Sequence, residues 1–130
     1  LKEVIEEFQK AGIRTSIFID TDLKLIEAAA KTGTDRIELY TEQFASDFEN
    51  GKKESVEPYK KAAILAHDLG MGINAGHDLN LDNLQYFIQE IPQTLEVSIG
   101  HALISDALYF GLNNAVQLYK SKINKEGFLD

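Results

Sequence analysis

Residues 71–91 read MGINAGHDLNLDNLQYFIQEI, and this stretch contains one complete strand-and-helix unit. Residues 71–75 predict a short strand, and Gly76-His77 follows at its end. Asn80 can cap the next helix, in which apolar residues recur at helical spacing until Pro92 ends it. A strand, a loop carrying glycine and histidine, and a helix therefore form the unit from which the chain is built.

The same pattern recurs on both sides of this stretch. Further strands are predicted at residues 13–19, 36–40 and 95–99. Helices are predicted at residues 1–11, from Thr21 to about Gly33, at 55–69 and at 104–120, the last with Ala107, Leu108, Leu112, Ala115 and Leu118 facing inward. The tail at 121–130 is polar and is expected to fray.

This alternation predicts an α/β fold with a parallel sheet and right-handed crossovers. Two architectures fit, an open doubly wound sheet or a stretch of a (β/α)₈ barrel. Polar residues inside the predicted strands favour the barrel, whose interior can hold them near the active face; they are Ser16, Glu38, Asn74 and Ser98. We therefore predict that residues 1–130 form a single partial domain, four consecutive βα units of a barrel that takes about 250 residues.

Composition excludes several classes of protein. The chain has no cysteine, which rules out disulfides, zinc–cysteine sites and iron–sulfur clusters. Its net charge of −8 disfavours nucleic-acid binding, and no apolar run is long enough to span a membrane. No metal-ligand spacing is found, so we expect no metal site. The absence of cysteine and of a secretory signal leads us to expect a cytoplasmic protein.

In either architecture the ligand lies outside the carboxyl ends of the strands. His77 stands at such an end, where an imidazole could give or take a proton near neutral pH. The alternative is a histidine that only caps the following helix or hydrogen-bonds the rim. None of the strands carries a lysine within it or at its end, so these units cannot supply the nucleophile of a Schiff-base aldolase.

Gly100-His101 predicts a phosphate site, because glycine lets the backbone approach an anion and the next helix presents free N–H groups. The alternative is a tight turn that needs glycine for a positive φ. Glu38 places a carboxylate in a mostly apolar strand and should share a face with Tyr40. For Glu38 the alternative is a buried ion pair.

Other polar residues near the strands are interpreted as structural. Asp20 is expected to cap the helix after it rather than to take part in catalysis. Arg14 and Arg36 lie at strand starts, away from the predicted ligand. Residues 41–57 form the longest polar stretch, which is either a lid or a solvated loop.

Four segments together carry a more specific signal: GIRTSIFID at 12–20, IELYT at 37–41, NAGHDL at 74–79 and SIGHALI at 98–104. In this order and spacing they resemble the pyridoxine 5′-phosphate synthase family, and the resemblance runs essentially from end to end. It implies the carboxy-terminal half of that barrel, strands five to eight with their helices.

The resemblance also implies roles for individual residues. The family condenses 1-deoxy-D-xylulose 5-phosphate with 3-amino-2-oxopropyl phosphate, releasing phosphate and water, as a transferase-type, ring-closing synthase without a cofactor. His77 corresponds to the family's proton donor and Glu38 to its stabilising carboxylate. Asp78, Gly100 and His101 correspond to the residues that hold the amino-ketone phosphate. Some members carry glycine where Asp78 stands, so this contact could be made by the backbone.

The resemblance further implies homo-oligomers built on dimers and an amino-terminal half that supplies the other active-site groups. We therefore expect these 130 residues to be part of a longer protein and to be inactive alone. Two other hypotheses stay open. The chain could belong to another phosphate-binding barrel, such as an isomerase or aldolase, or be a non-catalytic half-barrel that buries its open edges by self-association.

Overall fold

The computed structural model describes residues 1–124, which form a parallel four-stranded sheet with helices between the strands. The elements in chain order are α1 (Lys2–Lys10), β1 (Ser16–Ile19), α2 (Leu23–Ala30), β2 (Arg36–Tyr40), α3 (Glu42–Glu49), the 3₁₀ helix η1 (Lys53–Val56), α4 (Glu57–Asp68), β3 (Gly72–Gly76), α5 (Leu84–Glu90), β4 (Thr94–Ser98), α6 (His101–Phe110) and α7 (Leu112–Ile123). The predicted α/β class and the four predicted strands are confirmed, although β1 is shorter than expected.

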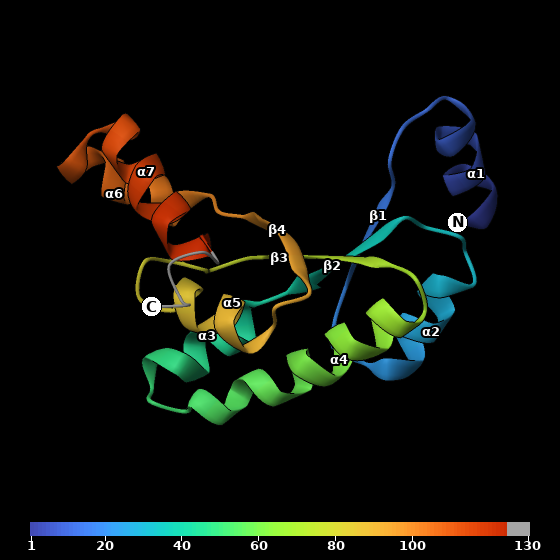
Figure 1. Ribbon diagram of the computed structural model, residues 1–130, viewed down its shortest axis with the longest axis horizontal. Helices are drawn as coiled ribbons and strands as arrows, with labels where there is room; N and C mark the ends of the chain where they lie inside the picture. Colours follow the sequence, from blue (N-terminus) through green and yellow to red (C-terminus); the bar gives the residue numbers. More distant parts are fainter. Residues whose placement is uncertain (125–130) are drawn as a thin grey trace.

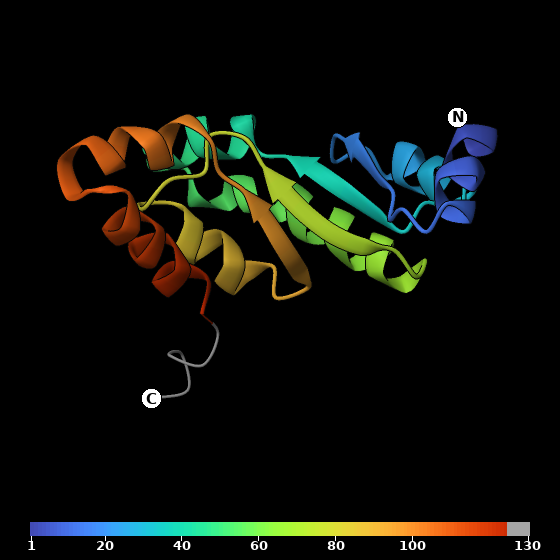
Figure 2. The same ribbon diagram turned by 90° about the horizontal axis from the view of Figure 1, so that it is seen from above.

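The strands pair in chain order, β1-β2-β3-β4, and each pair is parallel. Helices α2 to α5 lie on one side of the sheet, while α1 lies beyond its amino end and α6 and α7 beyond its carboxyl end (Figure 1). Seen from above, the strands lie uncovered in front of α4 (Figure 2). A doubly wound sheet carries helices on both faces and reverses its strand order, and residues 1–124 do neither.

The helix-covered face of the sheet forms the core. Ile37, Leu39 and Ile73 alternate along β2 and β3 and are almost fully buried against the helices. Their buried helical partners include Ile26, Phe44, Ala62, Ala63, Ala66, Leu84 and Phe87. The residues between them point to the opposite face, which is why the polar residues of the strands share one surface.

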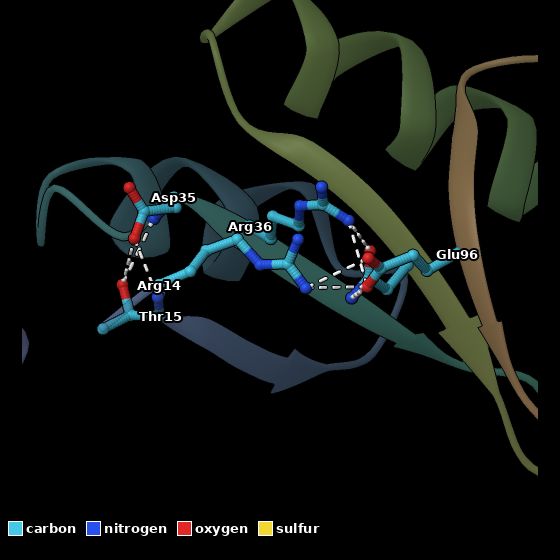
Figure 3. A network of polar contacts seen from close by, with 6 residues as sticks. Arg14, Thr15, Asp35, Arg36 and Glu96 are labelled. Atoms are coloured by element: carbon cyan, nitrogen blue, oxygen red, sulfur yellow. Dashed lines mark hydrogen bonds and ion pairs between the residues drawn. The ribbon is translucent and has the colours of Figure 1, made fainter. Parts of the chain in front are cut away.

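An ion-pair network spans that open face near the amino ends of the strands (Figure 3). Arg14, just before β1, donates to both carboxylate oxygens of Glu96 on β4, at 3.0 and 2.9 Å. Arg36 lies 3.1 Å from the same carboxylate and donates to Asn74 on the strand between them. A flat sheet would hold the first and fourth strands about 14 Å apart. The contact therefore indicates that the sheet twists and curves toward this face, and it agrees with a structural role for both arginines.

Residues 41–57 differ from the prediction. They are not a solvated loop, because α3 and η1 occupy most of the stretch and pack on the core. Phe44 is fully buried, and its ring lies 5.1 Å from that of Phe87 and 5.6 Å from that of Phe48, one helical turn on. The polar residues around these two phenylalanines concealed one apolar helical face.

The single helix predicted at 104–120 is also wrong. The structure has two helices, α6 and α7, joined at Gly111, whose φ of +79° breaks the helical path. Ala115 is buried as predicted, but Leu108 is 84% exposed and Leu112 59% exposed, so they do not face inward within residues 1–124. Residues 121–123 continue α7 rather than fray, and 125–130 lie outside the described residues.

The helix caps need smaller corrections. Asp22, not Asp20, caps α2, because its carboxylate accepts a hydrogen bond from the Lys24 N–H at 2.8 Å. Asn80 accepts from the N–H groups of Asp82 and Asn83, so it caps the turn that precedes α5. In the part of the chain that the structure describes, no helix is both long and apolar enough to cross a membrane.

Candidate functional site

A cavity of about 410 Å³ lies at the carboxyl ends of the strands. All five predicted site residues line it: Glu38, His77, Asp78, Gly100 and His101. They come from β2, from the turn after β3, and from the end of the turn after β4 together with the first residue of α6. Parallel pairing in chain order brings these three ends together, as the alternating pattern of the sequence predicted.

The turn after β3 has an unusual backbone. His77 has a φ of +87° and Asp78 a φ of +57°, and neither is glycine. Such conformations cost on the order of 1–3 kcal/mol each and persist only where the surroundings hold them, often at functional sites. Gly100, by contrast, has a φ of −104°, so the interpretation of this glycine as required for a positive φ is wrong.

Two aromatic rings from neighbouring strands hold the His77 ring at its edges. The Tyr40 ring centroid lies 4.7 Å from that of His77, and the Phe18 centroid lies 5.4 Å away. Phe18 and Tyr40 also contact each other at 5.3 Å. Within residues 1–124 no hydrogen bond to the imidazole is found, so the alternative of a capping or rim-bonded histidine has no support there. Both ring nitrogens are free to meet a ligand.

Glu38 lies across β3 with its carboxylate above Gly76. A Cβ atom at position 76 would sit 2.6 Å from Glu38 Oε1 and 3.0 Å from Ser98 Cβ. A side chain at position 76 would therefore force the Glu38 carboxylate to shift from its place between β2 and β4. The expected sharing of a face with Tyr40 is confirmed by their alternation on β2, and the described residues provide no ion-pair partner for Glu38. The alternative of a buried ion pair thus lacks support.

Hydrogen bonds from buried side chains fasten the backbone of the strained turn. The fully buried Thr41 donates its backbone N–H to the Gly76 carbonyl at 2.9 Å, and its hydroxyl lies 2.6 Å from the same oxygen. That hydroxyl also contacts the His77 carbonyl oxygen. Asn83, 2% exposed, donates to the Asp78 carbonyl at 3.2 Å. These contacts hold His77 and Asp78 in their positive-φ conformations.

His101 and Asp78 face each other across the cavity mouth. His101 Nε2 lies 3.3 Å from Asp78 Oδ1, and the His101 side chain is 80% exposed. His101 is also the first residue of α6, whose first-turn N–H groups have no carbonyl partner within the helix. Free N–H groups, the positive end of the helix dipole and an imidazole together form a surface suited to an anion.

Acidic side chains surround the other rim of the site. A hydrogen bond to the Glu42 carboxylate raises the pKa of the Tyr40 phenol, and partial burial and the charges of Glu42, Asp78 and Asp20 raise it further. Tyr40 is therefore a neutral phenol across the physiological range. Among residues 1–124 no group of three or more His, Asp or Glu side chains is arranged to hold a metal ion.

Sequence reasoning missed several contributors to the site. The sequence places Thr41 at a strand end without indicating a role for it, Ser98 is only a polar strand residue, and Phe18 carries no polar signal at all. The period-two alternation could have found Phe18, because it stands at the register position next to Glu38 on the same face. The positive φ values at 77 and 78 had only a weak signal: histidine and aspartate are enriched at positive φ among non-glycine residues, but most of them adopt negative φ.

Known proteins match nearly the whole chain, and these matches identify its family. The family model described as pyridoxal phosphate biosynthesis protein PdxJ matches residues 1–125. A curated relative from Flavobacterium johnsoniae, named pyridoxine 5′-phosphate synthase, is 66% identical over 95% of this chain and 52% of its own length. Relatives of the same name from Christiangramia forsetii and Porphyromonas gingivalis are 62% and 58% identical over 92% and 95% of this chain, and over 50% and 52% of their own lengths.

The chain thus spans about half the length of the curated relatives it matches. The match covers every described strand and helix and all five residues of the candidate site. On these grounds the resemblance seen in the four sequence segments is confirmed, and the chain belongs to the family of the pyridoxal phosphate biosynthesis protein PdxJ.

Proposed function

We propose that this chain supplies part of the active site of a pyridoxine 5′-phosphate synthase. The reaction condenses 1-deoxy-D-xylulose 5-phosphate with 3-amino-2-oxopropyl phosphate to give pyridoxine 5′-phosphate, phosphate and water. The observation that carries the proposal is the convergence of Glu38, His77, Asp78, Gly100 and His101 on one cavity. Curated relatives named for this activity support it.

The chemistry asks for proton transfers and for the loss of water and phosphate. His77 is the proton donor to a leaving group, because its imidazole reaches the cavity with both nitrogens free and is oriented by Tyr40 and Phe18. Glu38 stabilises positive charge that develops as the amine of one substrate condenses with the carbonyl of the other. Because the amine belongs to the substrate, no lysine of the enzyme is needed.

The first turn of α6 holds a substrate phosphate. Gly100 lets the backbone approach the anion, and His101 adds a donor from the side chain. Asp78 contributes through its backbone, because its carboxylate would repel a phosphate dianion at close range. The pairing of Asp78 with His101 keeps the imidazole at the cavity mouth when no ligand is bound.

We also propose that residues 1–130 are a single partial domain, the carboxy-terminal half of a (β/α)₈ barrel. Strand order without reversal, helices on one face and curvature toward the polar face support this architecture. The amino-terminal half of the same barrel is then the first partner of this chain, and the chain alone is inactive. The complete protein is proposed to be cytoplasmic and a homo-oligomer built on dimers, as the family resemblance implies.

The test uses the complete protein that contains this chain. Both phosphorylated substrates are added, and pyridoxine 5′-phosphate is followed by mass and by near-ultraviolet fluorescence. We expect product from the wild type and a loss of about 10²- to 10⁴-fold with His77→Ala, the usual range for a general acid. His67→Ala, an exposed histidine on α4, is the matched control and should keep full activity.

Each outcome separates the open hypotheses. No product from a folded, complete protein would contradict the proposed function, and binding of other sugar phosphates would then favour another barrel enzyme. Turnover by the 130-residue chain alone would refute the claim that it is only part of the site. Stable self-association without any phosphate binding would favour the non-catalytic half-barrel.

A further inference from the structure

Thr41 stands at the N-cap position of α3, but its side chain does not cap the helix. It is the residue before α3, where a threonine hydroxyl usually accepts a hydrogen bond from the first turn of the helix. Here its side chain makes no such capping bond. The hydroxyl instead turns toward β3 and contacts the carbonyl oxygens of Gly76 and His77. The Thr41 hydroxyl therefore stabilises the turn that carries His77 rather than the first turn of α3.

The two carbonyl oxygens do not depend on Thr41 equally. The Gly76 oxygen also accepts the Thr41 backbone N–H at 2.9 Å, so it keeps a partner when the hydroxyl is removed. For the His77 oxygen, the Thr41 hydroxyl is the one donor found within the described residues. A partly buried carbonyl that loses its donor is left in a less favourable environment, and this one belongs to a residue with a φ of +87°.

The position of the His77 ring follows from the same contacts. Thr41 adjoins Tyr40, whose ring lies 4.7 Å from that of His77, and the Tyr40 carbonyl accepts a hydrogen bond from the Tyr59 hydroxyl at 3.0 Å. The carboxyl end of β2 is thus fixed to α4, and Thr41 fixes the turn after β3 to that end. Two consecutive residues at the end of β2 thus contact His77: Tyr40 packs against its ring, and Thr41 binds its backbone carbonyl.

We propose that Thr41 is a positioning residue for the His77 imidazole: its hydroxyl holds the strained His77–Asp78 turn so that the ring faces the cavity. This inference deepens the proposed function and rests on it as far as turnover is concerned. It assigns to a buried threonine, which touches no substrate, a share in setting the geometry of proton transfer. A misplacement of about 1 Å costs as much as 10²-fold in rate.

The test compares three variants of the complete protein. Thr41→Val removes the hydroxyl and keeps the shape, and Thr41→Ser keeps the hydroxyl. Thr34→Val is the matched control, because Thr34 is also buried and its hydroxyl donates to the Arg36 carbonyl at 3.1 Å, at the opposite end of β2. All three are compared with the wild type in kcat, KM and melting temperature.

We expect Thr41→Val to lower kcat by about ten- to a hundredfold with KM changed less than about threefold. Thr41→Ser should recover most of the loss, and Thr34→Val should keep kcat near the wild-type value at a similar loss of melting temperature. Equal loss of kcat in Thr41→Val and Thr34→Val would show that Thr41 acts through stability alone and would overturn the proposal.

A second measurement does not depend on activity. Crystal structures of the Thr41→Val and Thr34→Val proteins should show the His77 ring displaced from Tyr40 in the first and unmoved in the second. If the ring stays within about 0.5 Å of its place in Thr41→Val, the proposal fails, since sites tolerate that much. If the wild type makes no pyridoxine 5′-phosphate, the proposed function fails, whereas the crystal comparison still decides whether Thr41 positions His77.

Discussion

The substitution Gly76→Ala, which adds one methyl group, should lower the activity strongly and the stability only slightly. Gly76 ends β3 beneath the Glu38 carboxylate, and the Cβ atom of Gly76→Ala would lie 2.6 Å from Glu38 Oε1. Ordinary contact begins near 3.4 Å, so the carboxylate must move by about 0.8 Å. The Cβ atom would also meet Ser98 Cβ at 3.0 Å and the Ser98 carbonyl oxygen at 3.2 Å, and β4 must give way slightly.

The two consequences differ in size. The carboxylate is the free end of a flexible side chain, so the loss of stability should stay near the lower end of the 1–3 kcal/mol that overpacking costs, about 1 kcal/mol. That corresponds to a fall of roughly 2–4 °C in melting temperature for a protein of 150–250 residues. Under the role proposed for Glu38 in stabilising the transition state, a shift of its carboxylate by nearly 1 Å should lower kcat by about ten- to a hundredfold.

Gly72→Ala is the matched control on the same face of the same strand. Its Cβ atom would meet Arg36 Cγ and Leu95 Cδ1 at 3.0 Å each, a milder clash with side chains at the amino end of β3. The assay follows pyridoxine 5′-phosphate formation by the complete protein, with thermal denaturation in parallel. Equal kcat for the two variants at equal loss of stability would refute the placement of Glu38 over Gly76 as the reason for a glycine there.

Two further predictions concern charges. Burial raises the pKa of the Glu96 carboxyl, but the hydrogen bond and charge of Arg14 and the charge of Arg36 lower it by more. The net effect is a pKa below the ordinary value. The stabilisation is therefore present above the ordinary pKa of 4.5 and lost as the pH falls below it, so Glu96→Gln should flatten the fall in urea midpoint between about pH 6 and about pH 3.5. An unchanged slope would contradict this pairing. Asp78→Asn should tighten the binding of inorganic phosphate at His101 by about two- to fivefold in calorimetry, because it removes an exposed negative charge, whereas weaker binding would mean that the Asp78 carboxylate itself contacts the ligand.

The strands and the site were predictable because their signals are local. Residues 36–40 form β2 at the predicted bounds, since the apolar Ile37 and Leu39 alternate with polar residues in this stretch. His77 and His101 were placed at the cavity because parallel strands that pair in chain order bring their carboxyl ends together. Position along the pattern was enough to locate them.

The missed features depend on contacts that a local pattern does not contain. The helix at 42–49 depends on one buried phenylalanine, Phe44, amid polar neighbours, and the break at Gly111 depends on a single backbone angle. The role of Thr41 is visible only after β2 and β3 pair, because its partners lie 35 and 36 residues away along the chain. Tertiary contacts of this kind override intrinsic preference.

The pairing of Arg14 with Glu96 also bears on the order in which the chain folds. Neighbouring strands pair across one intervening segment each, whereas this link joins residues 82 positions apart. Closing so long a loop directly is entropically unfavourable, but the loop is short once the three strand pairings exist. We therefore expect this link to form after the three strand pairings. Interactions that form late in folding mainly slow unfolding, so we expect replacement of Arg14 or Glu96 to speed unfolding more than it slows folding.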